Sequence, residues 1–151
     1  MKRSAQAKWQ GDLKSGTGTI STASGTLATT PYSFHSRFEQ GKGTNPEELL
    51  AAAHAGCFTM ALSAQLGEAG LKATSLETSC TITLEQKDGG FAITESHLEL
   101  KAKVPGATAE AFEKSRQEHH LADVRQRQRD RLRAAGRIEG DVLHHLVVDQ
   151  R

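Results

Sequence analysis

The sequence has few cysteines, few aromatic residues and no excess charge of either sign. Its 151 residues include two cysteines and 5% aromatic residues, and 19 basic against 18 acidic side chains give a net charge of +1. This balance gives no indication of a polyanion-binding or acidic solvating protein. Hydrophobic residues make up 36% of the chain. The length predicts a single domain over residues 1–151. Because the hydrophobic share is lean for an independent core, we expect this domain to bury surface against a second subunit.

Cys57 and Cys80 are too few for a disulfide framework and lack the spacing of a zinc site. The opening stretch, MKRSAQAKWQGDLKSG, has no apolar run behind its basic residues, so no secretory signal is expected. We therefore predict a cytoplasmic protein with reduced thiols. Any function of a cysteine there must come from its reactivity.

Residues 49–66, LLAAAHAGCFTMALSAQL, carry no charge, which reaches the lower length limit for a membrane span. The stretch is rich in alanine and contains His54 and Thr59, so we interpret it as a central helix in a core or subunit interface and predict no membrane contact. Asn45 is the expected N-cap, Pro46 the first helical residue and Glu48 the capping-box partner.

Other segments predict strands and a second helix. Short Thr/Ser-rich or aromatic stretches at 17–24 and 30–38 are typical of strands. The alternating runs 75–86 and 91–104 flank Lys-Asp-Gly-Gly and predict an antiparallel hairpin. Residues 108–124 predict a helix capped by Thr108, and residues 140–150 weakly indicate a final strand.

Cys57 lies in the middle of the expected helix, where a free cysteine is commonly a small buried hydrophobe. As a nucleophile it would have to be a thiolate, which needs a nearby cation. Arg37 is the sole arginine between residues 4 and 115; it is either that cation or a surface charge. Glu47 lies about 80° from Cys57 around the helix, and Glu48 about 180°. This favours Glu47 as the partner of Arg37, although both acids also suit the first turn of any helix.

The stretch GTNPEELL at 43–50, followed by AAAHAGCF and TMALS, resembles the signature of the OsmC/Ohr family. Upstream, WQGDLKSGTGTISTASG and PYSFHSRFEQGKGTNPEELL are similar to the OsmC branch, and downstream GEAGL and DGGFAIT also fit. The resemblance covers about residues 5–113.

The resemblance implies an α+β fold in which antiparallel sheets wrap around a central cysteine-bearing helix, as an intertwined homodimer. It implies thiol-dependent reduction of organic hydroperoxides, and less well of hydrogen peroxide, with a dithiol reductant in stress defence. Cys57, Arg37 and Glu47 fall at the catalytic positions. No metal, flavin or haem is required. Phe58, Met60 and Leu62 beside the cysteine would favour alkyl hydroperoxides, or are plain core residues.

The sequence departs from the family pattern at its second cysteine. A resolving cysteine followed by proline would fall near Asp123, where there is none. Cys80 lies on a predicted strand and is expected to be an inert buried thiol. Without a resolver, an external thiol must reduce the Cys57 sulfenic acid directly, or it over-oxidises. The alternative function is therefore a redox-sensing or binding dimer that does not turn over.

Three further motifs give weaker indications. GTGTIS lacks the third glycine and the following helix of a dinucleotide-binding loop. The adjacent pairs His119-His120 and His144-His145 cannot both face one metal on a regular element, so no metal site is predicted. The arginine-rich stretch 125–137 has no interleaved aromatics, which favours a solvated face over nucleic-acid binding.

Arginine usage changes abruptly near residue 114. Eight of the ten arginines and none of the aromatic residues lie in 114–151. We hypothesise that this atypical tail is translated in a shifted reading frame; the rival explanation is a divergent tail. Translating the coding DNA in the other two frames tests the hypothesis, and the absence of a Cys-Pro in the overlapping stretch contradicts it.

Overall fold

The computed structural model describes residues 1–87, 89–116 and 146–149, and the chain forms two compact units, Met1–Leu50 and Ala51–Arg151. The single-domain organisation expected from the length stays a prediction. The predicted helix 108–124 and strand 140–150 fall partly outside the described residues. The two histidine pairs, the Asp123 position and the arginine-rich stretch lie wholly outside them.

The first unit is built on a three-stranded antiparallel sheet of order β1-β2-β3. The strands are β1 (Ala5–Gln10), β2 (Thr17–Thr22) and β3 (Thr30–Ser33). The Asp12 carboxylate in the β1–β2 turn accepts hydrogen bonds from the Ser15 hydroxyl and from the amides of Ser15 and Lys14. These hydrogen bonds, above all the one from the Ser15 hydroxyl, lower the pKa of the Asp12 carboxyl from its ordinary value. The ionised carboxylate stabilises the β1–β2 turn fully at a pH above the ordinary carboxyl pKa. This stabilisation is lost as the pH falls through the lowered pKa of Asp12.

The expected strand over residues 30–38 is only half correct, because α1 (Phe34–Phe38) follows β3 directly. Ser33 ends the strand and caps the helix: its side chain accepts a hydrogen bond from the Ser36 amide, and the Ser36 side chain accepts one from the Ser33 amide. This reciprocal pair satisfies two backbone donors at the helix start. Arg37 therefore lies on a short helix and not on a strand.

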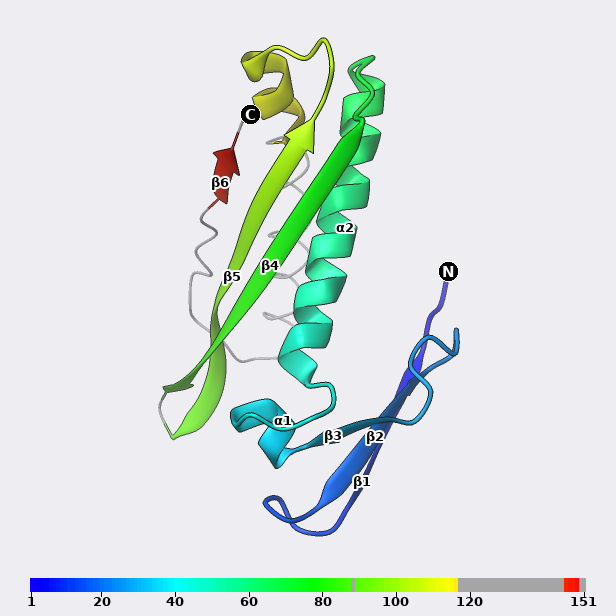
Figure 1. Ribbon diagram of the computed structural model, residues 1–151, viewed down its shortest axis with the longest axis vertical. Coiled ribbons are helices and arrows are strands. Elements are labelled where there is room, and N and C mark those ends of the chain that lie inside the picture. The colour runs from blue at the N-terminus through cyan, green and yellow to red at the C-terminus, as the bar shows by residue number, and fades with distance from the viewer. Residues whose placement is uncertain (88, 117–145, 150–151) are drawn as a thin grey trace. The chain divides into compact units, whose positions relative to one another are not determined.

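The second unit packs the long helix α2 (Pro46–Glu68) along a hairpin of β4 (Ser75–Lys87) and β5 (Gly90–Lys103) (Figure 1). The hairpin is antiparallel as predicted, with a register shift between Thr83 and Leu84. β6 (Leu146–Asp149) pairs with β5 in parallel. Residues 109–116 are helical, and the Ala111 amide donates to the Thr108 hydroxyl, which confirms Thr108 as the cap.

The core of this unit joins one side of α2 to the hairpin. Phe58, Leu62 and Leu66 recur every four residues, so they form one stripe along the helix. They pack against Leu98 and Leu100 of β5 and against Phe112. At about 1.5–3 kcal/mol for each fully buried side chain, this stripe holds α2 on the sheet. Phe58 and Leu62 are thus core residues, and only Met60 of the three apolar neighbours of Cys57 is exposed.

Candidate functional site

The loop that connects α1 to α2 is held by several hydrogen bonds. The Thr44 amide donates to the Pro31 carbonyl oxygen at 2.9 Å, and the Ser36 hydroxyl lies 2.9 Å from the Thr44 carbonyl oxygen. Gly43 has a φ of +123°, and a Cβ there would lie 2.5 Å from the Pro31 oxygen. Both the backbone conformation and the close approach require glycine. The Gly-Thr-Asn-Pro sequence therefore fixes the path of the chain into α2.

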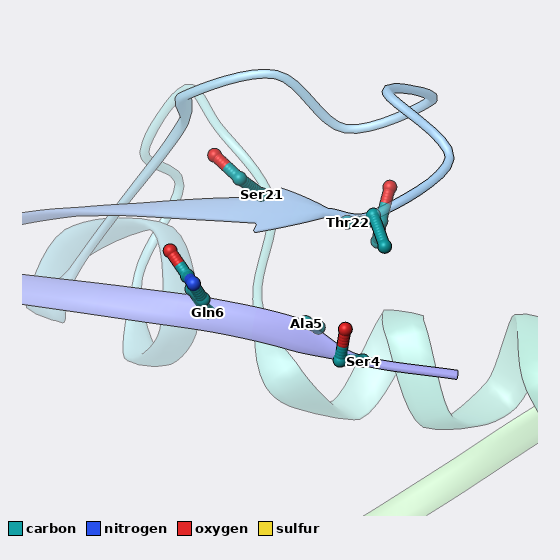
Figure 2. Close-up of a pocket in the computed structure, with 6 residues that line it drawn as sticks. Ser4, Ala5, Gln6, Ser21 and Thr22 are labelled. Atoms are coloured by element: carbon teal, nitrogen blue, oxygen red, sulfur yellow. The ribbon is translucent and has the colours of Figure 1, made fainter. Parts of the chain in front are cut away.

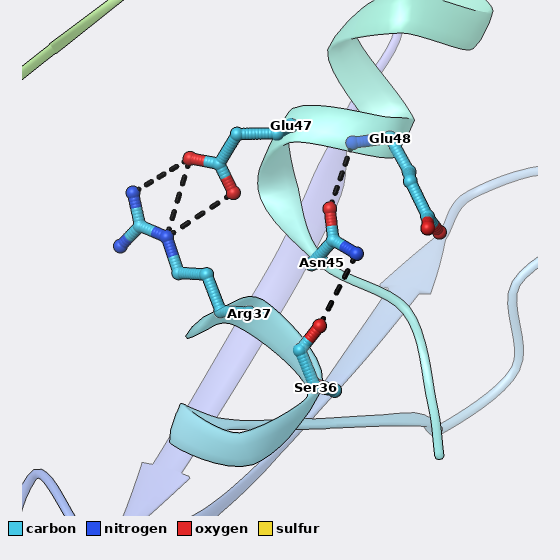
Figure 3. Close-up of polar contacts among 5 residues, drawn as sticks. All are labelled: Ser36, Arg37, Asn45, Glu47 and Glu48. Atoms are coloured by element: carbon cyan, nitrogen blue, oxygen red, sulfur yellow. Dashed lines mark hydrogen bonds and ion pairs between the residues drawn. The ribbon is translucent and has the colours of Figure 1, made fainter. Parts of the chain in front are cut away.

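Asn45 and Pro46 mark the start of α2 as predicted, and of the capping box expected with Glu48 the structure shows one hydrogen bond. The Glu48 amide donates to the Asn45 side-chain oxygen at 2.8 Å, and Pro46 is the first helical residue. The Asn45 side-chain amide donates to the Ser36 carbonyl oxygen at 3.3 Å. Asn45 is thus both the N-cap of α2 and a tie to α1, which places the first turn of α2 beside α1 (Figure 3).

Arg37 and Glu47 meet across this junction, as the helix geometry predicted. Arg37 Nη2 donates to Glu47 Oε1 at 2.7 Å, and Nε lies 3.2 Å from both carboxylate oxygens. The two side chains are 35% and 16% exposed, so the pair is partly shielded from water. The Arg37 guanidinium carbon also lies 5.0 Å from the Phe38 ring centre. Two-pronged contact to a carboxylate fixes the plane of the guanidinium, which a lysine could not reproduce.

Cys57 lies in the second unit, on the exposed side of α2. The prediction of a helical position is correct, but the thiol is not a buried core atom of this chain. The structure thus joins two of the three predicted catalytic residues, Arg37 and Glu47, in one unit and presents the third to solvent in the other. The catalytic roles of all three stay predictions.

Sequence reasoning missed a polar cluster around the second cysteine. Ser96 Oγ lies 2.7 Å from His54 Nδ1, and Cys80 Sγ lies 3.5 Å from Ser96 Oγ and 3.8 Å from His54 Nδ1. Cys80 is half-buried and not fully buried as expected, because polar side chains of α2 and β5 share that part of the sheet face. The alternation of β4 indicated an inward-facing Cys80, but no pattern linked it to His54.

The described part of the chain also has a small open pocket at the end of β1 and β2 (Figure 2). Its lining provides hydroxyl and amide groups but no nucleophilic thiol, histidine or charged side chain, so it offers no means of catalysis. The lining residues are Ser4, Ala5, Gln6, Ser21, Thr22 and Ala23.

Comparison with known proteins decides the family. The model of OsmC-like proteins matches residues 39–121, which is more than half of the chain. The chain belongs to the OsmC-like family. The match includes Glu47 and Cys57, begins just after Arg37, and runs past residue 113, where the resemblance in the motifs ends.

The relatives of this chain include an OsmC protein and an organic hydroperoxide resistance protein. The chain is 53% identical to peroxiredoxin OsmC of Escherichia coli over 111 residues, which are 74% of the chain and 78% of the relative. It is 39% identical to the organic hydroperoxide resistance protein of Xanthomonas axonopodis over 67 residues, which are 44% and 45% of the two chains. The crystal structure of OhrB of Bacillus subtilis superposes with a TM-score of 0.62 at 23% identity, over 95% of this chain and 98% of that one. The fold is therefore the predicted α+β fold of this family.

The Arg37–Glu47 contact should be measurable as a coupling free energy. We expect Arg37→Lys and Glu47→Gln to be non-additive in a double-mutant cycle of unfolding by urea, with a coupling of about 0.5–1 kcal/mol, because the pair is only partly buried. Glu48→Gln is the matched control, since it removes a charge from the same helical turn without touching Arg37 (Figure 3). Equal coupling of Arg37 to Glu48 would contradict a specific pair.

Proposed function

We propose that this chain is a thiol-dependent peroxidase that reduces organic hydroperoxides, with Cys57 as the nucleophile. The observation that carries the proposal is an exposed thiol on the helix whose first turn holds the Arg37–Glu47 pair. Support comes from the named relatives, which include a peroxiredoxin and an organic hydroperoxide resistance protein. The geometry and the family together favour redox chemistry at Cys57 over binding alone.

In the proposed reaction the Cys57 thiolate attacks one peroxide oxygen. The S–O bond forms as the O–O bond breaks, the alcohol leaves after taking up a proton, and Cys57 becomes a sulfenic acid. Thiols then reduce the sulfenic acid back to the thiol, with release of water and formation of a disulfide in the reductant. A dithiol completes this step within one reductant molecule.

Arg37 is proposed to be the cation that favours the thiolate and stabilises the negative charge that develops on the leaving oxygen. The carboxylate of Glu47 would keep the guanidinium in one plane and offset the cost of removing it from water. Glu47 is accordingly a positioning residue, because it acts through Arg37 and not on the peroxide.

The rate of peroxide consumption should depend strongly on Cys57 and on the shape of residue 37. With tert-butyl hydroperoxide and a dithiol, we expect Cys57→Ser to lower kcat/KM by about 1,000-fold or more, because the hydroxyl is a far weaker nucleophile. Arg37→Lys should cost about 100-fold by losing the fixed donor geometry.

The controls separate this function from its alternative. Glu48→Gln should retain the full rate, because its carboxylate does not hold Arg37. Consumption of a single equivalent followed by arrest would instead support the redox sensor that does not turn over. Unchanged turnover in Cys57→Ser would falsify the proposed nucleophile.

We further propose that a second copy of the chain covers the exposed side of α2. Only 17% of the most apolar 18-residue window of this helix is buried, and the helix is long and apolar enough by composition to span a membrane. A contiguous apolar face of this kind requires a cover, and small side chains allow a second backbone to approach closely. The exposed residues of this face are Leu50, Ala52, Ala53, Gly56, Cys57, Met60, Ser63, Ala64 and Gly67.

Sedimentation should therefore give twice the chain mass of 16.3 kDa. Met60 is 77% exposed on this face, so Met60→Arg would bring a charge into the interface and should shift the protein to the monomer. Leu13→Arg, at a residue 68% exposed in the β1–β2 turn, is the matched control and should leave the dimer intact. A wild-type monomer that instead sediments with lipid vesicles would contradict the dimer and favour a membrane.

A further inference from the structure

The sequence contains a second thiol that the proposed reaction does not use, and the structure places it beside the helix that carries Cys57. Cys80 projects from β4 toward α2, where its sulfur lies 3.8 Å from His54 Nδ1. His54 precedes Cys57 by three residues on α2. Side chains three apart on a helix are neighbours, with Cβ atoms about 5–6 Å apart. His54 therefore contacts Cys80 and lies about one helical turn before Cys57 on the same helix.

The surroundings of Cys80 suit an exchangeable thiol better than an inert one. Its sulfur is within reach of the Ser96 hydroxyl at 3.5 Å, and Ser96 in turn lies 2.7 Å from His54 Nδ1. Ser96 is buried, so these polar groups satisfy one another in an otherwise apolar region. An imidazole beside a thiol can take up the thiol proton, which is the step that makes the sulfur a nucleophile.

The turn of α2 around Cys57 contains two features that weaken a helix. Gly56 directly precedes Cys57, and a Cβ at Gly56 would meet no other part of the described residues within 4 Å, so packing among those residues does not require glycine there. Glycine in a helix interior costs about 1 kcal/mol relative to alanine. The Thr59 hydroxyl donates to the Ala55 carbonyl oxygen at 2.7 Å, a contact that slightly destabilises and often bends helices.

We propose that Cys80 is the resolving thiol of this protein and forms an intramolecular disulfide with oxidised Cys57. The inference rests on the proposed function, since a hydroperoxide must first convert Cys57 to the sulfenic acid. The Cys80 sulfur then attacks the Cys57 sulfur, the S–S bond forms as the S–O bond breaks, and the hydroxide leaves as water with the Cys80 proton transferred through His54. Cys57 faces solvent and Cys80 faces the helix, so the turn that contains Gly56 must unwind for the sulfurs to meet.

A single-turnover experiment on the full-length protein tests this assignment. Reduced protein, freed of reductant, is treated with one equivalent of cumene hydroperoxide and digested without reduction. Mass spectrometry should then find the Cys57 and Cys80 peptides linked, two hydrogens lighter than their sum, and the free thiols per chain should fall from two to none. The linked pair must also form at low protein concentration, because the bond lies within one chain.

Two variants and one control sharpen the test. Cys80→Ala should leave the first oxidation intact but allow dimedone to trap the Cys57 sulfenic acid, and excess peroxide should over-oxidise it. Ser96→Ala retains both thiols and should slow disulfide formation without changing the rate of Cys57 oxidation, which a merely structural residue would not do. Ser79→Ala, on the opposite and exposed face of β4, should behave as wild type.

The outcomes that overturn the proposal are distinct from those that overturn the peroxidase. If wild-type Cys57 is oxidised while Cys80 remains a free thiol, the resolving role is wrong and the peroxidase stands. A disulfide between Cys57 residues of two chains overturns the resolving role in the same way. If neither cysteine reacts with the hydroperoxide, the proposed function fails and the resolving role fails with it. The wild-type peptide map decides between these results even if Cys80→Ala does not fold.

Discussion

The packing of one side of α2 on the β4–β5 hairpin is the interaction on which the second unit depends. Leu62, Leu66, Leu98 and Leu100 are the largest fully buried side chains of the described residues, and they come from this single contact. A helix with one buried stripe must leave its remaining sides to solvent or to a partner. Because the stripe is set by Phe58, Leu62 and Leu66, Cys57 is turned away from the core. The position of the proposed nucleophile is thus a consequence of core packing.

The first unit depends on polar contacts where the second depends on apolar ones. Ser33 and Asn45 each cap a helix with a side chain, and Asn45 also ties α2 to Ser36. Capping contacts of this kind are worth about 1 kcal/mol each, which is comparable with the expected coupling of Arg37 to Glu47. The ion pair is therefore one of several contacts of similar strength at this junction. The Asn45 side chain joins α2 to α1 through the Ser36 carbonyl oxygen, and the Arg37–Glu47 pair joins the same two helices.

Local signals in the sequence predicted what neighbouring residues determine. Asn45 and Pro46 marked the start of α2, the alternation around Lys-Asp-Gly-Gly marked the hairpin, and helical geometry selected Glu47 over Glu48. The helix α1 was missed because Ser33 caps a helix directly after a strand, and aromatic residues on both sides of it favoured a continuous strand. The cluster of His54, Cys80 and Ser96 was missed for another reason. Its members lie 26 and 42 residues apart from His54, so only the packing of α2 on the sheet brings them together.

The two proposals that involve α2 constrain each other. The exposed side of the helix carries both the proposed nucleophile and the apolar surface that a second copy would cover, so assembly would remove water from around Cys57. In such a site a cation stabilises a thiolate more strongly than in bulk water, which links the dimer to the chemistry. A covered Cys57 is also harder for an external thiol to reach. An internal partner such as Cys80 would protect the sulfenic acid from over-oxidation, and an external thiol would then reduce the disulfide to complete the cycle.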